Sequence, residues 1–123
     1  MTEIPDLMRL AAGAARHAAS RQATLAANVA NADTPGFLAR DVDAFSPDDG
    51  FALRRADPRH FAGRTGAGAE AHVLRDVPAD PNGNTVDLED QVLRGIDAAR
   101  AHDRALTVYR SSLDLLRASL GRS

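Results

Sequence analysis

Apolar and small residues recur at alternating steps of four and three along the first part of the chain. This a/d heptad spacing is typical of a helix that packs along one stripe against a partner helix. It predicts a helix from Asp6 to about Ala32, with Pro5 suited to the first turn. The stripe consists of Ile4, Met8, Ala11, Ala15, Ala18, Gln22, Leu25 and Val29.

The same spacing predicts a second, longer helix from Asp87 to about Leu120. Asp87 suits the N-cap, and an acidic first turn is favoured by the positive end of the helix dipole. Gly121 is a suitable residue to end the helix. The stripe of this second helix consists of Leu88, Val92, Gly95, Ala99, His102, Leu106, Tyr109, Leu113, Leu116 and Leu120.

Between the helices, from Phe37 to about Asn84, the periodicity is lost because prolines and glycines interrupt it. Short strands fit the text "GFALRR" and "AHVLRDV". A loop of this length without structure is unusual in a compact domain. Either the segment folds as a small β excursion, or a partner orders it.

The fold class predicted from these patterns is mainly α, with the terminal helices forming an antiparallel coiled-coil hairpin around an irregular or small-β middle. The regions 1–36, 37–85 and 86–123 belong to a single domain. Apolar residues outside the two stripes exceed what a two-helix contact buries, so either the middle segment or a partner covers them. They include Leu7, Leu10, Leu93, Ile96, Val108 and Leu115.

Composition narrows the function classes. The chain has 123 residues, of which 44% are hydrophobic and only 4% aromatic, so the core must be thin and rich in alanine. A net charge of −2 gives no basis for binding nucleic acid or an anionic membrane. No apolar run is long enough for membrane insertion. The N-terminal residues lack the features of a cleavable signal peptide, so export would keep the N-terminus.

Catalytic or metal-binding patterns are not found. His17, His60, His72 and His102 have no companion at metal-ligand spacing, and cysteine is absent. The basic stretch Arg54–Arg64 could meet a phosphate, a carboxylate or peptidoglycan, but a solvated loop is the favoured interpretation. We therefore predict no enzyme, no cofactor and no metal site.

The segment "ANVANADTPGF" at residues 27–37 holds the most specific pattern. Pro35 and Gly36 suit the two central positions of a type II turn. Asn31 suits the end of the helix. Asn28 lacks such a local explanation, since asparagine inside a helix is unfavourable.

This segment resembles the N-terminal signature of bacterial flagellar rod and hook axial proteins, which is close to N-I-A-N-x-x-T-P-G-Y. Val29 replaces the usual Ile, and Phe37 replaces the usual Tyr. "LARDVDAF", "DPRHFAG", "GNTVDLEDQV" and "LDLLRASLGR", together with the short chain, resemble the proximal rod subunits of this family. His102-Asp103 departs from an aromatic that is frequent there. The motif positions are Asn28, Ala30, Asn31, Thr34, Pro35, Gly36 and Phe37.

The resemblance implies a structural subunit of the proximal rod that self-assembles through its terminal helices into a tube transmitting torque from motor to hook. The implied partners are further copies, other rod proteins, and the basal adaptor at the membrane ring and export gate. It also implies export by the flagellar type III apparatus and a place in the basal body. A soluble adaptor or export chaperone is the alternative. The predicted helix–helix interface comprises Met8, Ala15, Leu25, Val29, Leu106, Tyr109, Leu113 and Leu116.

Overall fold

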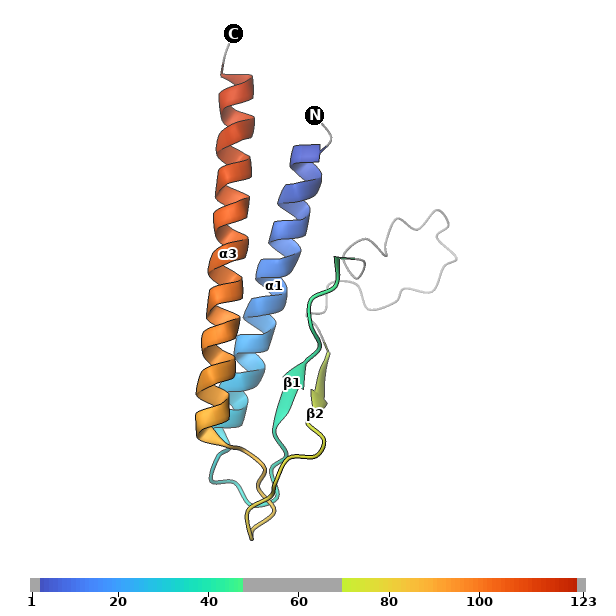
Figure 1. Cartoon of the computed structure of the whole chain (residues 1–123), viewed down its shortest axis with the longest axis vertical. Helices are drawn as coiled ribbons and strands as arrows, with labels where there is room; N and C mark the ends of the chain where they lie inside the picture. Colours follow the sequence, from blue (N-terminus) through green and yellow to red (C-terminus); the bar gives the residue numbers. More distant parts are fainter. Residues whose placement is uncertain (1–2, 48–69, 122–123) are drawn as a thin grey trace, which may run out of the picture.

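Two long antiparallel helices, with a small two-stranded sheet beside them, make up the computed structural model, which describes residues 3–47 and 70–121 (Figure 1). Helix α1 spans Glu3–Ala30 and helix α3 spans Leu88–Leu120. The start of α1 and the end of α3 lie at the same end of the pair. The predicted mainly-α hairpin is confirmed.

The helix ends follow from local chemistry. Helix α1 stops at Ala30, two residues before the predicted end, where the turns of the motif begin. At the start of α3, the Asp87 carboxylate accepts the backbone N–H groups of Glu89 and Asp90 at 3.0 and 3.3 Å, which is the predicted N-cap. At its end, the Gly121 N–H donates to the Arg117 carbonyl at 2.8 Å. In the described part of the chain, neither helix has the length and apolarity needed to cross a bilayer.

Small residues form the centre of the contact between α1 and α3. The buried positions on α1 are Ala11, Ala18, Leu25 and Asn28, and those on α3 are Gln91, Ala98, Ala105 and Ser112. Each α3 position is separated from the next by seven residues, which is one heptad. Short side chains let the two backbones approach closely, so the contact depends on proximity more than on bulky apolar groups.

The buried stripe on α3 differs from the predicted one. Gln91, Ala98, Ala105 and Ser112 each precede by one residue a position of the predicted stripe. On α1, Asn28 likewise takes the place predicted for Val29, whose side chain is 48% exposed. At three of these α3 positions the prediction followed the larger apolar residue (Val92, Leu106 and Leu113), whereas the helix–helix contact selects the smaller or hydrogen-bonding one; at the fourth, both candidates are alanine.

The sheet pairs β1 (Arg40–Val42) with β2 (Ala71–Val73) in antiparallel orientation. Asp41 lies opposite His72, and the Leu74 N–H extends the pairing by donating to the Ala39 carbonyl at 2.9 Å. The strand expected in "AHVLRDV" is confirmed as β2, whereas β1 was not predicted. The expected strand "GFALRR" lies outside the described residues.

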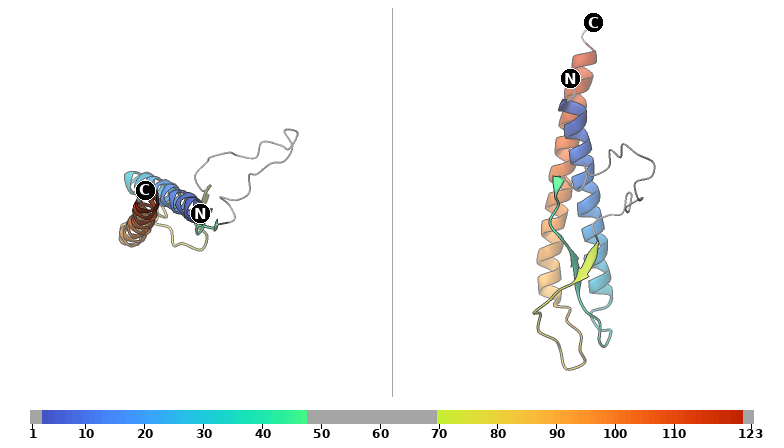
Figure 2. Two further views of the ribbon diagram at one scale, coloured as in Figure 1. Left: turned by 90° about the horizontal axis from the view of Figure 1, so that it is seen from above. Right: turned by 90° about the vertical axis from the view of Figure 1, so that its right-hand side faces the viewer.

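The segment from β1 onward runs along one face of α1 (Figure 2). The Asp43 carbonyl lies 2.7 Å from His17 Nε2, and the Phe45 ring packs near His17 with a centroid separation of 5.6 Å. A β-carbon at Gly13 would lie 3.6 Å from the Phe45 ring, so the ring packs against this turn of α1. The strand pair therefore covers one side of the helix pair.

We expect Ala18→Leu to destabilise the subunit. Ala18 is 1% exposed, and added methylenes in such a contact typically cost about 1–3 kcal/mol. Urea unfolding followed by circular dichroism would measure the loss. Ala26→Leu, on the exposed side of the same helix, is the matched control. Equal midpoints for the two variants would contradict the close packing described above.

Candidate functional site

The motif turn has the predicted conformation. Gly36 has a φ of +73°, which favours glycine, and the Phe37 N–H donates to the Thr34 carbonyl at 3.2 Å, as in a type II turn. Asn31 Nδ2 donates to the Ala27 carbonyl at 2.8 Å and so caps the end of α1. Thr34 Oγ1 donates to Asn31 Oδ1 at 3.1 Å, which links the cap to the turn.

Asn28 is buried and bonds to two other segments of the same subunit. Its Nδ2 donates to the Arg40 carbonyl at 2.6 Å and to Gln91 Oε1 at 2.8 Å. Its Oδ1 accepts the Arg40 N–H at 3.0 Å. The amide thus pairs with the backbone of Arg40 as a neighbouring strand would, while it also holds α3. This is the reason for an asparagine inside the helix that the sequence leaves unexplained.

Asn84, in the loop before α3, is a second buried asparagine that bonds to another segment of the subunit. Its buried Nδ2 donates to the carbonyls of Asn31 and Thr34 at 2.9 and 2.8 Å. Its Oδ1 accepts the Val86 N–H at 2.7 Å, so every bonding group of the side chain faces a backbone partner. The loop that leads into α3 is therefore fixed to the motif turn that follows α1.

Two glycine turns meet at this point. The Gly36 N–H donates to the Asn82 carbonyl at 3.0 Å, and Gly83 has a φ of +85°. A β-carbon at Gly83 would lie 3.4 Å from the Gly36 Cα, so the two turns pack backbone against backbone. We call the assembly of the two turns with Asn28, Arg40 and Gln91 the junction. In the described residues, no buried side-chain nitrogen or oxygen lacks a hydrogen-bond partner.

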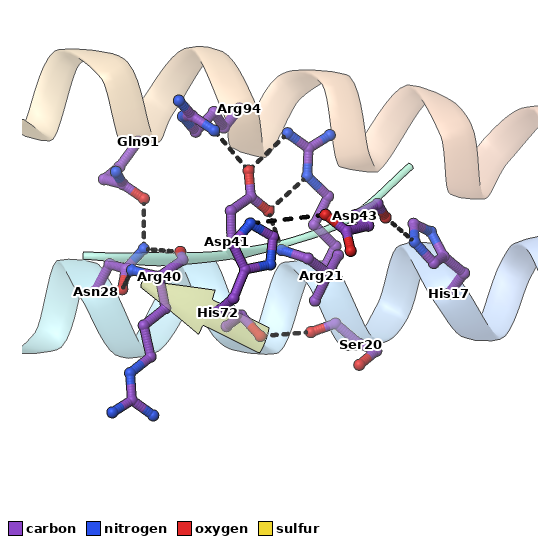
Figure 3. A network of polar contacts seen from close by, with 12 residues as sticks. His17, Ser20, Arg21, Asn28, Arg40, Asp41, Asp43, His72, Gln91 and Arg94 are labelled. Carbon is purple, nitrogen blue, oxygen red and sulfur yellow. Dashed lines mark hydrogen bonds and ion pairs between the residues drawn. The ribbon is translucent and has the colours of Figure 1, made fainter. Parts of the chain in front are cut away.

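A charged cluster lies next to the junction (Figure 3). The Asp41 carboxylate of β1 accepts Arg21 Nε and Nη2 from α1 at 3.0 and 3.1 Å. It also accepts Arg94 Nη1 from α3 at 2.6 Å and the Val42 N–H at 2.7 Å. Arg94 Nε donates in addition to Asp90 at 2.7 Å. One buried carboxylate therefore joins three elements, and we call it and the two arginines the charge cluster.

The environment of Asp41 sets its protonation. Burial by itself would raise the pKa of this carboxyl group, but hydrogen bonds from Arg21, Arg94 and the Val42 N–H outweigh burial and lower the pKa below 3.8. Burial likewise opposes the charge of Arg94, and the carboxylates of Asp90 and Asp41 reverse this and raise its pKa. Asp41 and Arg94 are therefore held in their charged forms at neutral pH.

The structure brings the motif residues together around the junction, although they differ in exposure. Ala30 and Pro35 are exposed, and Phe37 is half-buried, with its carbonyl accepting the Thr85 N–H at 3.0 Å. Among the predicted interface residues, Leu25 is buried between the helices and Val29 is exposed. The half-buried ones are Met8, Ala15, Leu106, Tyr109, Leu113 and Leu116.

The three histidines in the described residues do not form a site of their own. His17 and His72 both approach Asp43, the former at its carbonyl and the latter at its carboxylate, where His72 Nε2 lies 3.6 Å from Oδ1. His102 is half-buried on α3, while His60 and the basic stretch Arg54–Arg64 lie outside the described residues. Within the described ranges, no three histidine, aspartate or glutamate side chains gather to hold a metal ion.

Several residues of the site were not predicted. Asp41, Arg21, Arg94, Asn84 and Gln91 supply most of the buried polar contacts. One signal was present in the heptad spacing. Arg21 and Asn28 on α1 are seven residues apart, as are Gln91 and Ala98 on α3, but the predicted stripes did not include these positions. Polar residues at such positions point to specific contacts between helices.

Comparison with known proteins assigns the family. The flagellar basal body rod protein FlgB of Salmonella typhimurium (strain LT2) is 35% identical over 108 residues, which cover 77% of this chain and 78% of that protein. This chain belongs to the FlgB family of flagellar basal body rod proteins. FlgB of Proteus mirabilis (strain HI4320) is 34% identical over 113 residues (81% of this chain and 82% of that protein). FlgB of Escherichia coli (strain K12) is 30% identical over 108 residues, with coverage of 77% and 78%.

The broader family described as "Flagella basal body rod protein" matches residues 8–37. This range includes most of α1 and the whole motif turn, so the part of the chain that matches the broader rod family also builds one half of the junction. The resemblance stated from the motif is confirmed.

Asn28→Ala should destabilise the subunit by at least about 1–3 kcal/mol, because the Gln91 amide loses a buried partner. Chemical unfolding would measure this loss. Asn31→Ala removes two hydrogen bonds that are both exposed to solvent, and it should therefore cost less. If the two alanine variants had equal stability, the central role of Asn28 in the junction would be wrong.

The stability that Asp41 contributes should depend on pH in a defined direction. Because the folded-state pKa lies below 3.8, the contribution is present above this value and is lost as the pH falls through the folded pKa. The difference in unfolding free energy between the wild type and Asp41→Asn should therefore shrink as the pH falls below 3.8. A difference that stays constant down to about pH 2 would show that the carboxylate charge is not what stabilises the cluster.

Proposed function

We propose that this protein is a structural subunit of the proximal part of the flagellar rod, which it builds through contacts of its terminal helices. The observation that carries the proposal is the exposed apolar surface of the helix pair. Leu88, Val92, Leu93 and Ile96 on α3 are 44–61% exposed. An apolar surface of this kind marks an interface.

Part of this surface lies on a definite side of the pair. Asn28 and Gln91 face each other, and one residue further along each helix turns by about 100°. In an antiparallel pair these two turns lead to the same side, so Val29 and Val92 project together. Asp90 and Arg94 project on the opposite side, where β1 docks. The open side of the pair is the surface we assign to a neighbouring subunit.

The end of the helix pair opposite the junction, where α1 begins and α3 ends, offers a second contact. Glu3 lies 25 residues before Asn28, and Leu116 lies 25 residues after Gln91, so the final turn of α3 extends beyond α1 (Figure 1). Leu115 and Leu120 at this end are 63% and 69% exposed. The apolar groups at this end and on the open side allow contacts that repeat without closing, which is how a filament grows.

The partners we propose are further copies of this chain, other rod proteins, and the basal adaptor at the membrane ring and export gate. The place of the protein is the basal body, reached through the flagellar type III apparatus without a cleaved signal peptide. A contact centred on alanine buries little apolar area per residue, which supports ready unfolding during such export. Helices of about 42 and 50 Å suit a subunit that transmits torque.

A structural role without catalysis also fits the buried polar groups. In the described residues, the buried Asn28, Asp41, Asn84 and Gln91 bond to one another's segments rather than converge on an open cleft. The alternative of a soluble adaptor or chaperone differs in where the protein is found: a rod subunit co-purifies with basal bodies, and an adaptor stays in the soluble fraction.

Val92→Asp should abolish incorporation into the rod while leaving the monomer folded. Val92 is 59% exposed in the subunit, but an unpaired carboxylate in a subunit contact loses its solvation. Motility of a strain carrying only the variant and its presence in purified basal bodies would measure the effect. Val92→Leu keeps the surface apolar and is the matched control. Normal motility with Val92→Asp would remove the open side from the interface.

A further inference from the structure

The charge cluster places two like charges from opposite helices on one carboxylate. Arg21 of α1 and Arg94 of α3 bind Asp41 at distances of 2.6–3.1 Å, so their guanidinium groups lie close to each other as well (Figure 3). The Asp41 side chain is 5% exposed, against 23% and 30% for the two arginines. Little water therefore contacts this carboxylate, so the two arginines are its main partners.

Without Asp41, the two helices would repel each other where Arg21 of α1 and Arg94 of α3 lie close together. Within the described residues, Asp41 is the acid that contacts Arg21, whereas Arg94 also contacts Asp90, whose side chain is 41% exposed. Asp90 can neutralise only one of the two cations. Like charges at such separations oppose each other most strongly where the solvent is partly excluded.

We propose that Asp41 is a charge clasp that makes the closing of α1 on α3 depend on the docking of β1. Until β1 brings the carboxylate between the arginines, the helices repel each other at this level. With β1 docked, the same two arginines hold both helices to it. Closing of the pair and docking of the strand are thus one cooperative step. This inference concerns the folding of a single subunit and does not depend on rod assembly.

Other contacts of β1 allow the clasp to be tested separately. Asn28 holds Arg40, the neighbour of Asp41, through backbone groups that carry no charge. Other titratable groups near the strand include Arg40 on β1 itself, His17 on α1, Asp43 after β1 and His72 on β2. In the described residues, none of these side chains has a hydrogen bond or ion pair with either arginine. Replacing Asp41 by asparagine therefore removes the central charge while the strand keeps its uncharged attachment.

The decisive measurement is the response of stability to salt. Urea, which carries no charge, would unfold the wild type and Asp41→Asn at low and high NaCl, with helix content followed by circular dichroism. Salt shortens the range of electrostatic forces from about 10 Å at 0.1 M to about 3 Å at 1 M. The wild-type midpoint should fall slightly or stay constant with salt. The midpoint of Asp41→Asn should be lower at low salt and should rise with salt, because the repulsion is screened.

Two further variants complete the design. Asp41→Asn combined with Arg94→Gln leaves one cation, so its midpoint should recover in part and lose the rise with salt. Asp43→Asn removes the same charge two residues away, where the side chain is 88% exposed, and should behave as the wild type does.

The outcomes decide the proposal even if Asp41→Asn is unfolded at low salt. In that case, added salt or the second substitution Arg94→Gln should restore the helical signal. A midpoint of Asp41→Asn that changes with salt as the wild type does would overturn the clasp. So would a loss of stability in Asp41→Asn that neither salt nor Arg94→Gln relieves, since the carboxylate would then act only through its own hydrogen bonds and not by cancelling a repulsion.

Discussion

The hydrogen bonds of the buried Asn28 side chain are the interaction on which the rest of the subunit depends. They attach the backbone of Arg40 to α1 and the side chain of Gln91 to the same point. Because Arg40 is fixed, its neighbour Asp41 is carried into the space between Arg21 and Arg94. Asn84 then fixes the loop that leads into α3. A buried amide with every bonding group paired is specific in geometry, since any displacement leaves a costly unpaired group.

The distribution of polar and apolar groups differs from that of an ordinary globular domain. Here the interior holds alanine, serine and fully bonded polar groups, with Leu25 and Val42 as its larger apolar members. The large aliphatic side chains of α3 are all half-buried or exposed. The internal contacts give the subunit its shape, whereas the apolar area that stabilises proteins through its removal from water is left on the outside. A subunit built in this way gains much of its stability only when neighbours cover it.

The sequence was sufficient to predict features that local chemistry decides. The two helices, the Asp87 cap, the turn at Pro35 and Gly36, and the strand at Ala71–Val73 each follow from periodicity, capping or turn preferences. The motif also pointed to its family. These features depend on residues close together in the chain, which is why pattern analysis finds them.

Features that depend on pairing between distant segments were not predicted. Strand β1 exists because Asn28 and β2 provide partners for its backbone, and three residues have too little pattern to show this. The stripe on α3 was placed one residue late at four positions, because Val92 looks more suitable for a core than Gln91. The ion pairs of Asp41 join residues 20 and 53 positions apart, and charge alone does not say which arginine meets which acid.

The seven-residue step of the small buried residues has a consequence for how the helices choose their alignment. Ala98, Ala105 and Ser112 on α3 repeat almost the same shape, as do Ala11 and Ala18 on α1. A slip of one helix by a whole heptad would therefore place small residues against small residues again and lose little packing. The same slip would separate Asn28 from Gln91 and Asp41 from Arg94. The alanine ladder brings the helices together without selecting their register, and the polar groups at one end make the selection for the full length of the pair.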